Sequence, residues 1–256
     1  MKRAAAIAFV VLASVSCGAT EPVASSAPTT PGSPAPSSAP SSVPSSTPSS
    51  SVTTPASPQT PSPTRTGPPA FSAKVTKISR DRLPYSWRPG CPVPYQDLRL
   101  VTMTYWGFDD QPHTGELVVR DTVTDDVVTV FRKLYDWRWP IRQMKLVDAY
   151  KADDYASIDA DNTSAFNCRR ATGSSSWSKH SYGQAIDLNP LENPYVTADG
   201  GTAHKNAKKY ASRPMSGKGV INAGDKVVKA FANVGWEWGG YWSGTKDYQH
   251  FSKGGG

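Results

Sequence analysis

Aromatic residues are almost absent from the first quarter of this chain of 256 residues, with none between Phe9 and Phe71. Fourteen of the 23 prolines fall from Glu21 to Pro69, interleaved with Ser, Thr and Ala. Such a segment buries too little apolar surface to offset the entropy lost on ordering, so we expect a disordered linker over residues 18–69. Its proline density favours extended polyproline II, at about 3.1 Å per residue and on the order of 150 Å in all. Its Ser, Thr and Pro content also suits O-glycosylation.

The start of the chain lacks an apolar run long enough for a permanent membrane-spanning helix. Lys2 and Arg3 precede a short apolar stretch that ends at Ala13, and small residues then lead to Cys17. This order is typical of a secretory signal, so we expect residues 1–17 to direct export.

A cysteine directly after small residues resembles the bacterial lipoprotein signal, in which the thiol receives a diacylglycerol group. Ser14 stands where that family usually has Leu. The resemblance implies that Cys17 is lipidated and becomes the new N-terminus. The chain would then be anchored to the outer face of the bacterial cell membrane and reach into the cell wall. An ordinary signal peptide that leaves a free cysteine is the alternative.

Blocks of Lys or Arg are absent, although the chain carries a formal net charge of +7. Loss of Lys2 and Arg3 with the signal would leave +5, spread thinly over the remainder. A nucleic-acid groove needs clustered basic residues, so we expect no nucleic-acid partner. The surplus suits anionic wall polymers or lipid head groups.

Residues 70–256 hold all eight tryptophans and all eleven tyrosines, and they show neither an internal repeat nor a second low-complexity break. We expect one folded domain there, with a monomer as the default. Cysteine is scarce: besides Cys17 there are Cys91 and Cys168. In an oxidising compartment this remaining pair predicts a Cys91–Cys168 disulfide, with two buried free thiols as the alternative.

Residue patterns predict helices on a small antiparallel sheet, which is an α+β domain. One helix should run from Asp121 or Thr122 to about Trp137; in a second, Asn222 is the cap, Asp225 lies in the first turn and Gly235 ends the helix. The predicted strands are Leu98–Tyr105, Gly115–Arg120, Ile141–Tyr150, Ala185–Leu188 and Tyr248–Ser252.

The candidate chemistry lies in Cys168–Pro190 and Asp247–Ser252. Together these segments contain His180, Asp187 and His250, and two imidazoles with one carboxylate are the ligand set of a catalytic zinc site. Gly183 permits a sharp turn after His180. In a strand, the Asp187 side chain points opposite to its two apolar neighbours and so toward the returning His250.

Other polar residues near these ligands suit hydrolysis. Asp247 lies three residues before His250, where a carboxylate can take a proton from a zinc-activated water and pass it to a leaving amine. Arg169 and Arg170 are candidates for stabilising an oxyanion or binding a substrate carboxylate. Ser178 is a candidate hydrogen-bonding group.

An aromatic cluster near the C-terminus comprises Trp236, Trp238, Tyr241 and Trp242. It would line a substrate groove, with Trp242 as the substrate-binding candidate; packing into the core is the alternative for at least half of the cluster. His113 and His204 have no clear partners, and we expect His204 to be exposed.

Ser178–Asp187, SKHSYGQAID, resembles the SxHxxGxAxD signature of the zinc D-alanyl-D-alanine carboxypeptidase and L-alanyl-D-glutamate peptidase family. DYQHF, from Asp247, is similar to its second signature, and the similarity covers nearly all of residues 85–252. The resemblance implies a hedgehog/DD-peptidase-like fold, one Zn²⁺ on His180, Asp187 and His250, and Asp247 as catalytic acid/base. It also implies a catalytic arginine, for which Arg169 is favoured over Arg170.

The resemblance thus implies that residues 70–256 are a zinc peptidase domain that hydrolyses peptidoglycan stem peptides. Carboxypeptidase and endopeptidase activities both remain open; many relatives carry Glu at the position of Asp247, and Asp occurs in the endopeptidase-like branch. The alternatives are a non-catalytic, zinc-containing wall-binding lipoprotein and a hedgehog-like signalling module. The second is disfavoured by the lipoprotein signal and the missing autoprocessing region.

Overall fold

The computed structural model describes residues 67–255. The predicted signal 1–17, with Cys17, and the predicted linker as far as residue 66 lie outside the described residues. Within 67–255, no helix is long and apolar enough to cross a membrane. The structure therefore bears on the domain expected over residues 70–256.

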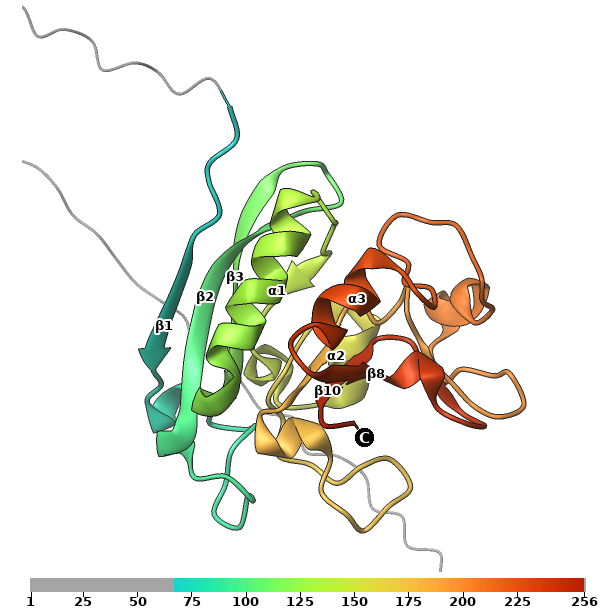
Figure 1. Ribbon diagram of the computed structural model, residues 1–256. Helices are drawn as coiled ribbons and strands as arrows, with labels where there is room; N and C mark the ends of the chain where they lie inside the picture. The colour runs from blue at the N-terminus through green and yellow to red at the C-terminus, as the bar shows by residue number, and fades with distance from the viewer. Residues whose placement is uncertain (1–66, 256) are drawn as a thin grey trace, which may run out of the picture. The chain divides into compact units, whose positions relative to one another are not determined.

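The N-terminal part of the domain is an antiparallel sheet with the order β1–β2–β3 (Figure 1). Its strands are β1 (Ala73–Lys77), β2 (Leu98–Trp106) and β3 (Pro112–Arg120). Side chains alternate along β2, so that Leu98 and Leu100 pack on one face of the sheet while Val101 and Met103 pack on the other. The two strands predicted here are confirmed, and β1 is an addition.

Helix α1 (Thr124–Asp136) follows a 3-10 turn at Asp121–Val123 and packs across this sheet (Figure 1). Its buried stripe of Val127, Val130, Phe131 and Leu134 recurs at helical spacing, as the sequence predicts. Acidic residues in the first turn complement the helix dipole.

A second antiparallel sheet, with the order β6–β10–β8, carries the C-terminal part of the chain. Its strands are β6 (Ala185–Asp187), β10 (His250–Lys253) and β8 (Trp236–Trp238). Helix α3 (Lys226–Ala232) packs on it, with Phe231 stacked on Phe251 at a ring separation of 4.0 Å. The same apolar core continues from this sheet to α1 and β2.

Shorter elements connect these layers. They are α2 (Asp154–Asp159), a parallel pair β4 (Gln143–Met144) and β5 (Asn162–Thr163), an antiparallel pair β7 (Tyr195–Val196) and β9 (Lys246–Asp247), and the 3-10 helices η1 (Arg80–Arg82), η2 (Tyr95–Asp97), η4 (Val147–Tyr150), η5 (Lys179–Tyr182), η6 (Lys205–Tyr210) and η7 (Gly239–Tyr241). The predicted α+β class is confirmed, with two three-stranded sheets where one small sheet was expected.

The strand predicted over Ile141–Tyr150 is wrong beyond β4. The Asn162 side chain accepts a hydrogen bond from the backbone N–H of Lys145, and the pairing of β4 with β5 ends there. The chain then turns into η4, where the Asp148 carboxylate accepts hydrogen bonds from the backbone N–H groups of Tyr85 and Ser86. A side-chain acceptor thus replaces a strand partner at Lys145, and the residues that follow form a 3-10 helix instead of a strand.

Two boundaries near the C-terminus also differ from the prediction. Asn222 does not cap α3: the helix begins at Lys226, and the Asp225 carboxylate accepts a hydrogen bond from the Asn222 N–H. The last strand begins at His250, because the backbone N–H of Tyr248 donates instead to Pro194.

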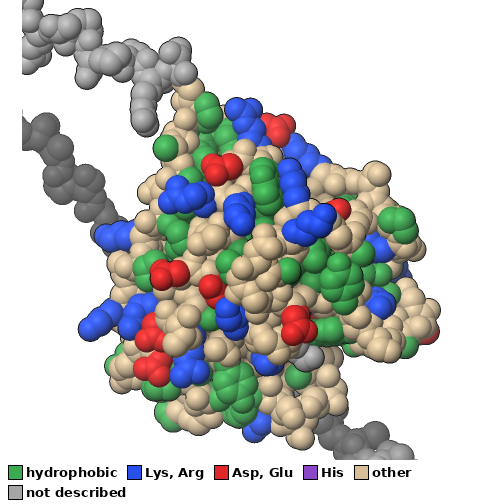
Figure 2. All heavy atoms as spheres, in the orientation of Figure 1, with side chains coloured by type: hydrophobic (Ala, Val, Ile, Leu, Met, Phe, Trp, Pro, Cys, Tyr) green, Lys and Arg blue, Asp and Glu red, His purple; other side chains and the backbone are tan. Residues whose placement is uncertain are grey.

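Basic and acidic side chains are mixed over the face shown in Figure 2, with no single block of Lys and Arg. This agrees with the thin distribution of charge in the sequence.

Candidate active site

His180, Asp187 and His250 are buried together at the second sheet. Strands β6 and β10 place Asp187 directly opposite His250 in the register. The Asp187 carboxylate lies 3.1 Å from His250 Nδ1 and 3.2 Å from His180 Nε2, and the two ring nitrogens are 3.2 Å apart. Residues 70 positions apart in the chain thus converge on one point.

A tight turn sets the orientation of His180. Ser178 precedes η5 and accepts the His180 N–H through its hydroxyl, and Gly183 ends the turn with φ +65°. A Cβ on Gly183 would lie 2.6 Å from the Arg120 nitrogen, so glycine is required twice over. His180 Nδ1 lies 2.5 Å from the Ala165 carbonyl, which only accepts. Nδ1 is therefore the donor, and Nε2 turns its lone pair toward Asp187 and His250.

The ionisation of Asp187 depends on the two histidines that face it, and that of His180 depends on Asp187. Burial alone would raise the pKa of Asp187, but the facing His180 and His250 rings hold it well below its usual range. Burial lowers the pKa of His180, and the opposing Asp187 carboxylate outweighs it and raises that pKa. Two imidazoles and one carboxylate, with their candidate ligand atoms all within 4.8 Å of one another, fit a zinc ion by number and chemistry.

A cavity of about 330 Å³ opens over the three side chains. Its other walls include Arg169, Trp177, Lys179, Tyr195, Trp242 and Asp247. A larger cavity of about 740 Å³, around Arg142 and Glu192, contains none of the three donors. The smaller cavity is therefore the candidate active site, because it joins the donor cluster to open space.

Asp247 lies in β9, paired with Tyr195 of β7, and lines the cavity. Its Oδ1 is buried and has no hydrogen-bond partner among residues 67–255. Burial, followed by the negative charge of Asp187, raises the pKa of Asp247 to about 7, against the opposing charges of His250 and Arg169. A carboxyl group with this pKa can both accept and release a proton near neutral pH.

The structure separates the two candidate arginines. Arg169 lines the cavity, and its Nη2 lies 2.9 Å from Asp154 Oδ2. Arg170 is not part of the cavity wall: its guanidinium stacks on Trp177 at 3.8 Å and donates to the Ser175 carbonyl at 2.6 Å. The predicted substrate-binding role of Arg170 thus has no direct geometric support, although Arg170 packs on a wall residue.

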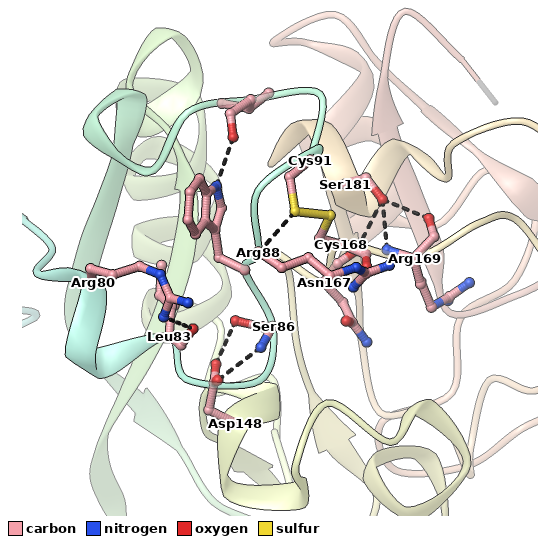
Figure 3. The surroundings of a disulfide bond; sticks show 12 residues. Arg80, Leu83, Ser86, Arg88, Cys91, Asp148, Asn167, Cys168, Arg169 and Ser181 are labelled. Carbon is pink, nitrogen blue, oxygen red and sulfur yellow. Dashed lines mark hydrogen bonds between the residues drawn. A yellow bond between two sulfur atoms is a disulfide. The ribbon is translucent and has the colours of Figure 1, made fainter.

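The predicted Cys91–Cys168 disulfide is present, with an S–S distance of 2.03 Å (Figure 3). It ties the loop before β2 to the residue that precedes Arg169. Arg88 donates to the Cys168 carbonyl at 2.7 Å, and the Cys168 N–H donates to Ser86. The alternative of two free thiols is wrong.

Two of the four clustered aromatic residues pack into the core, as the alternative interpretation expected: Trp236 and Trp238 are 2% and 3% exposed. Trp242 lines the cavity, with its ring 5.4 Å from that of His250. Tyr241 is exposed and does not line it. Sequence reasoning missed the wall residues Trp177, Lys179 and Tyr195, because Lys179 stands at a variable position of the first motif and the other two lie outside both motifs.

The remaining histidines lie outside the cavity. His113 is exposed and pairs with Asp109 at 3.0 Å. The expectation that His204 is exposed is wrong: it is buried, with Nδ1 2.7 Å from the Asp159 carboxylate and its ring packed at a tilt against Tyr155. The Gly- and Lys-rich sequence around His204 gave no sign of this contact with α2.

Residues 172–253 match the family model described as D-alanyl-D-alanine carboxypeptidase. The match spans about a third of the chain and includes His180, Asp187, Asp247 and His250. No curated protein and no solved structure matches the chain. The resemblance read from the two motifs is confirmed, and it supports a peptidase that acts on cell-wall peptides. Residues 172–253 are thus similar to the D-alanyl-D-alanine carboxypeptidase family.

Proposed function

We propose that this protein is a zinc-dependent peptidase that hydrolyses stem-peptide bonds of peptidoglycan. The observation that carries the proposal is the buried His180–Asp187–His250 cluster at the base of a cavity that also contains the unpartnered carboxyl group of Asp247. Three protein donors beside an open cavity distinguish a catalytic zinc site from a closed structural one. The family match supports the same class of reaction.

The three donors would hold the ion, and a bound zinc ion would polarise the scissile carbonyl and make water more acidic. Asp247 takes the proton from the attacking water and passes it to the leaving amine nitrogen. The Arg169 guanidinium donates to the carbonyl oxygen as negative charge develops there. The hydrogen bond from His180 Nδ1 to Ala165 keeps Nε2 free as a ligand.

The family match and the walls of the cavity support a substrate class. We infer that bonds near D-amino acids are cut, with Trp242, Trp177 and Tyr195 contacting the peptide. Ser178 is only 8% exposed and caps η5, so its role is to hold His180 as much as to bind substrate. Carboxypeptidase and endopeptidase activities are distinguished by the masses of the products.

Metal analysis and digestion of purified muropeptides, followed by mass spectrometry, test the proposal. We expect about one zinc ion per chain and cleavage that a chelator abolishes. Asp247→Asn should still bind zinc, and its rate of muropeptide cleavage should fall about 10²–10⁴-fold. Asp109→Asn, which removes a carboxylate on the exposed β2–β3 turn, is the matched control and should cleave like the wild type.

Each contrary result has a distinct meaning. Zinc without cleavage of any muropeptide would favour the non-catalytic wall-binding protein. A chain that binds no zinc would refute the mechanism, as would an Asp247→Asn variant with the wild-type rate.

We further propose that residues 1–17 direct export and that Cys17 carries the lipid. Residues 18–69 would then tether the domain of residues 70–256 to the outer face of the cell membrane. The support is the sequence pattern alone. Mass spectrometry of the N-terminal peptide from membranes should show a diacylglycerol-modified Cys17, and Cys17→Ser should release the protein into the soluble fraction. An unmodified N-terminus on a membrane-free protein would contradict this anchor.

A further inference from the structure

We propose that Asp154 is a positioning residue of the active site, whose carboxylate holds the Arg169 guanidinium at the cavity wall. The proposal rests on the proposed function, because it concerns how the arginine of that reaction is oriented. Asp154 itself does not line the cavity, so it acts through Arg169 and not on a substrate.

The backbone of Arg169 is held firmly. Its N–H donates to the Ser181 hydroxyl at 2.9 Å, and its carbonyl accepts from that hydroxyl at 2.6 Å and from the Ser178 N–H at 3.1 Å. The preceding residue is the disulfide-bonded Cys168. These contacts fix where the side chain starts and leave its long aliphatic stem free to rotate.

The guanidinium, in contrast, has one charged partner within residues 67–255. Nη2 is 2.9 Å from Asp154 Oδ2, Nη1 makes a longer bond of 3.3 Å to the Arg170 carbonyl, and Nε is buried without a partner. A free arginine side chain loses much rotamer entropy on being ordered. The ion pair with Asp154 is therefore the contact that sets the direction of the guanidinium N–H donors of Arg169.

Asp154 is well placed to give this orientation. It is the first residue of α2, and the preceding Asp153 caps that helix by accepting the Ala156 N–H at 3.0 Å. At the far end of α2, Asp159 pairs with the buried His204. The helix is thus held at both ends. The Asp154 carboxylate therefore stays in place and does not move with the flexible Arg169 side chain. A donor held in advance stabilises developing charge without reorganisation.

A double-mutant cycle on the full chain tests this role, with kcat and KM measured on a muropeptide that the wild type cleaves. Arg169→Ala should lower kcat by about 10²–10³-fold, as loss of an oxyanion donor does. Asp154→Ala should lower kcat about tenfold with little change in KM, because the transition state alone uses the oriented donor. In the double variant, Asp154→Ala should add nothing to the loss caused by Arg169→Ala.

Three measurements separate positioning from general stability. Asp154→Glu should recover part of the rate. Asp109→Asn, which removes a carboxylate that pairs with the exposed His113 at the β2–β3 turn, should keep the wild-type kcat. Denaturant midpoints of the same four proteins in the cycle, which need no activity, should show Asp154 and Arg169 to be coupled.

The proposal is overturned if Asp154→Ala slows the Arg169→Ala variant as much as it slows the wild type, or if it leaves kcat unchanged. Additive denaturant midpoints would also overturn it. A zinc-loaded wild type that cleaves no muropeptide would refute the proposed function itself and, with it, any role of Asp154 in that reaction. A failure of Asp154 alone would leave Asp247 and the zinc ligands as essential as before.

Discussion

At the scale of single residues, the active site depends on groups whose protonation and placement are set by their neighbours. His180 owes its free Nε2 to the Ala165 carbonyl, and Asp247 owes its raised pKa to burial and to the charge of Asp187. Neither effect belongs to the residue type. Each arises because the fold brings a particular acceptor or charge within a few ångströms.

Gly239 shows how little space the site allows. A Cβ there would lie 2.6 Å from the Asp247 carbonyl oxygen and 2.9 Å from its Cβ. Gly239→Ala should therefore displace Asp247 and lower kcat at least tenfold while zinc stays bound, because the three ligands are not touched. Metal content and muropeptide kinetics check this. Gly67→Ala, with no atom within 4 Å and no positive φ, is the control, and equal rates for the two variants would contradict the prediction.

Two further acidic residues, Glu192 and Asp161, lie at the larger cavity, and their side chains are 6% and 5% exposed. Arg142 approaches them at only 3.7 and 3.4 Å. Burial, together with the neighbouring Asp161, raises the pKa of Glu192 to about 8. Since an exposed Glu has a pKa of about 4.3, the folded protein holds a proton that the unfolded chain has lost between about pH 4 and pH 8. This pair therefore lowers stability as the pH rises through that window.

Glu192→Gln should remove that pH dependence, because a neutral amide needs no proton and still donates to Asp161. In metal-free protein we expect its free energy of unfolding to exceed that of the wild type by several kcal/mol at pH 8 and to equal it below pH 4. Urea unfolding at the two pH values measures this. Glu237→Gln, on an exposed position of β8, should change neither value. A Glu192→Gln variant that gains nothing at pH 8 would show that Arg142 already neutralises the pair.

At the scale of elements, the turns and short strands decide the site more than the helices do. The pairing of β6 with β10 sets Asp187 against His250, the β7–β9 pair carries Asp247, and η5 aims His180. Alternation and helical periodicity predicted β2, β3 and α1 well, since these elements bury a regular stripe. The predicted strand over 141–150 failed because the Asn162 side chain accepts the Lys145 N–H and the chain then turns into η4, where the Asp148 carboxylate accepts from the Tyr85 N–H.

The disulfide acts at this scale, joining positions 77 residues apart. The chain-entropy model gives about 4 kcal/mol for a loop of this length. Cys91→Ser with Cys168→Ser should therefore lower the free energy of unfolding by about 4 kcal/mol in denaturant titrations. Activity should fall as well, because Arg169 follows directly after Cys168. Cys17→Ser is the matched control and should leave the unfolding curve unchanged; a double variant as stable as wild type would refute the estimate.

At the scale of the whole molecule, the candidate zinc site joins the middle of the sequence to its end. Binding to the folded state alone stabilises it by about 4.1 kcal/mol at a free-metal concentration 1,000 times Kd. For a domain of this size, that corresponds to a rise in Tm of about 10 °C. We therefore expect a chelator to lower Tm by about that amount in thermal unfolding.

The same experiment identifies the ligands. Asp187→Asn should start at the lower Tm and show no response to chelator, whereas Asp159→Asn should respond like the wild type. A chelator response that survives in Asp187→Asn would place the metal elsewhere.

The local features could be read from the chain before folding: the α+β class, the two histidine motifs and the cysteine pair. Each of these follows from composition, periodicity or a short spacing, which the chain carries before it folds. Only the tertiary structure decided that Arg169 and not Arg170 reaches the cavity, that Trp177, Lys179 and Tyr195 form its walls, and that Asp154 faces the arginine. These are contacts between segments distant in sequence or between neighbours whose side chains diverge. They depend on register and packing, which no local pattern records.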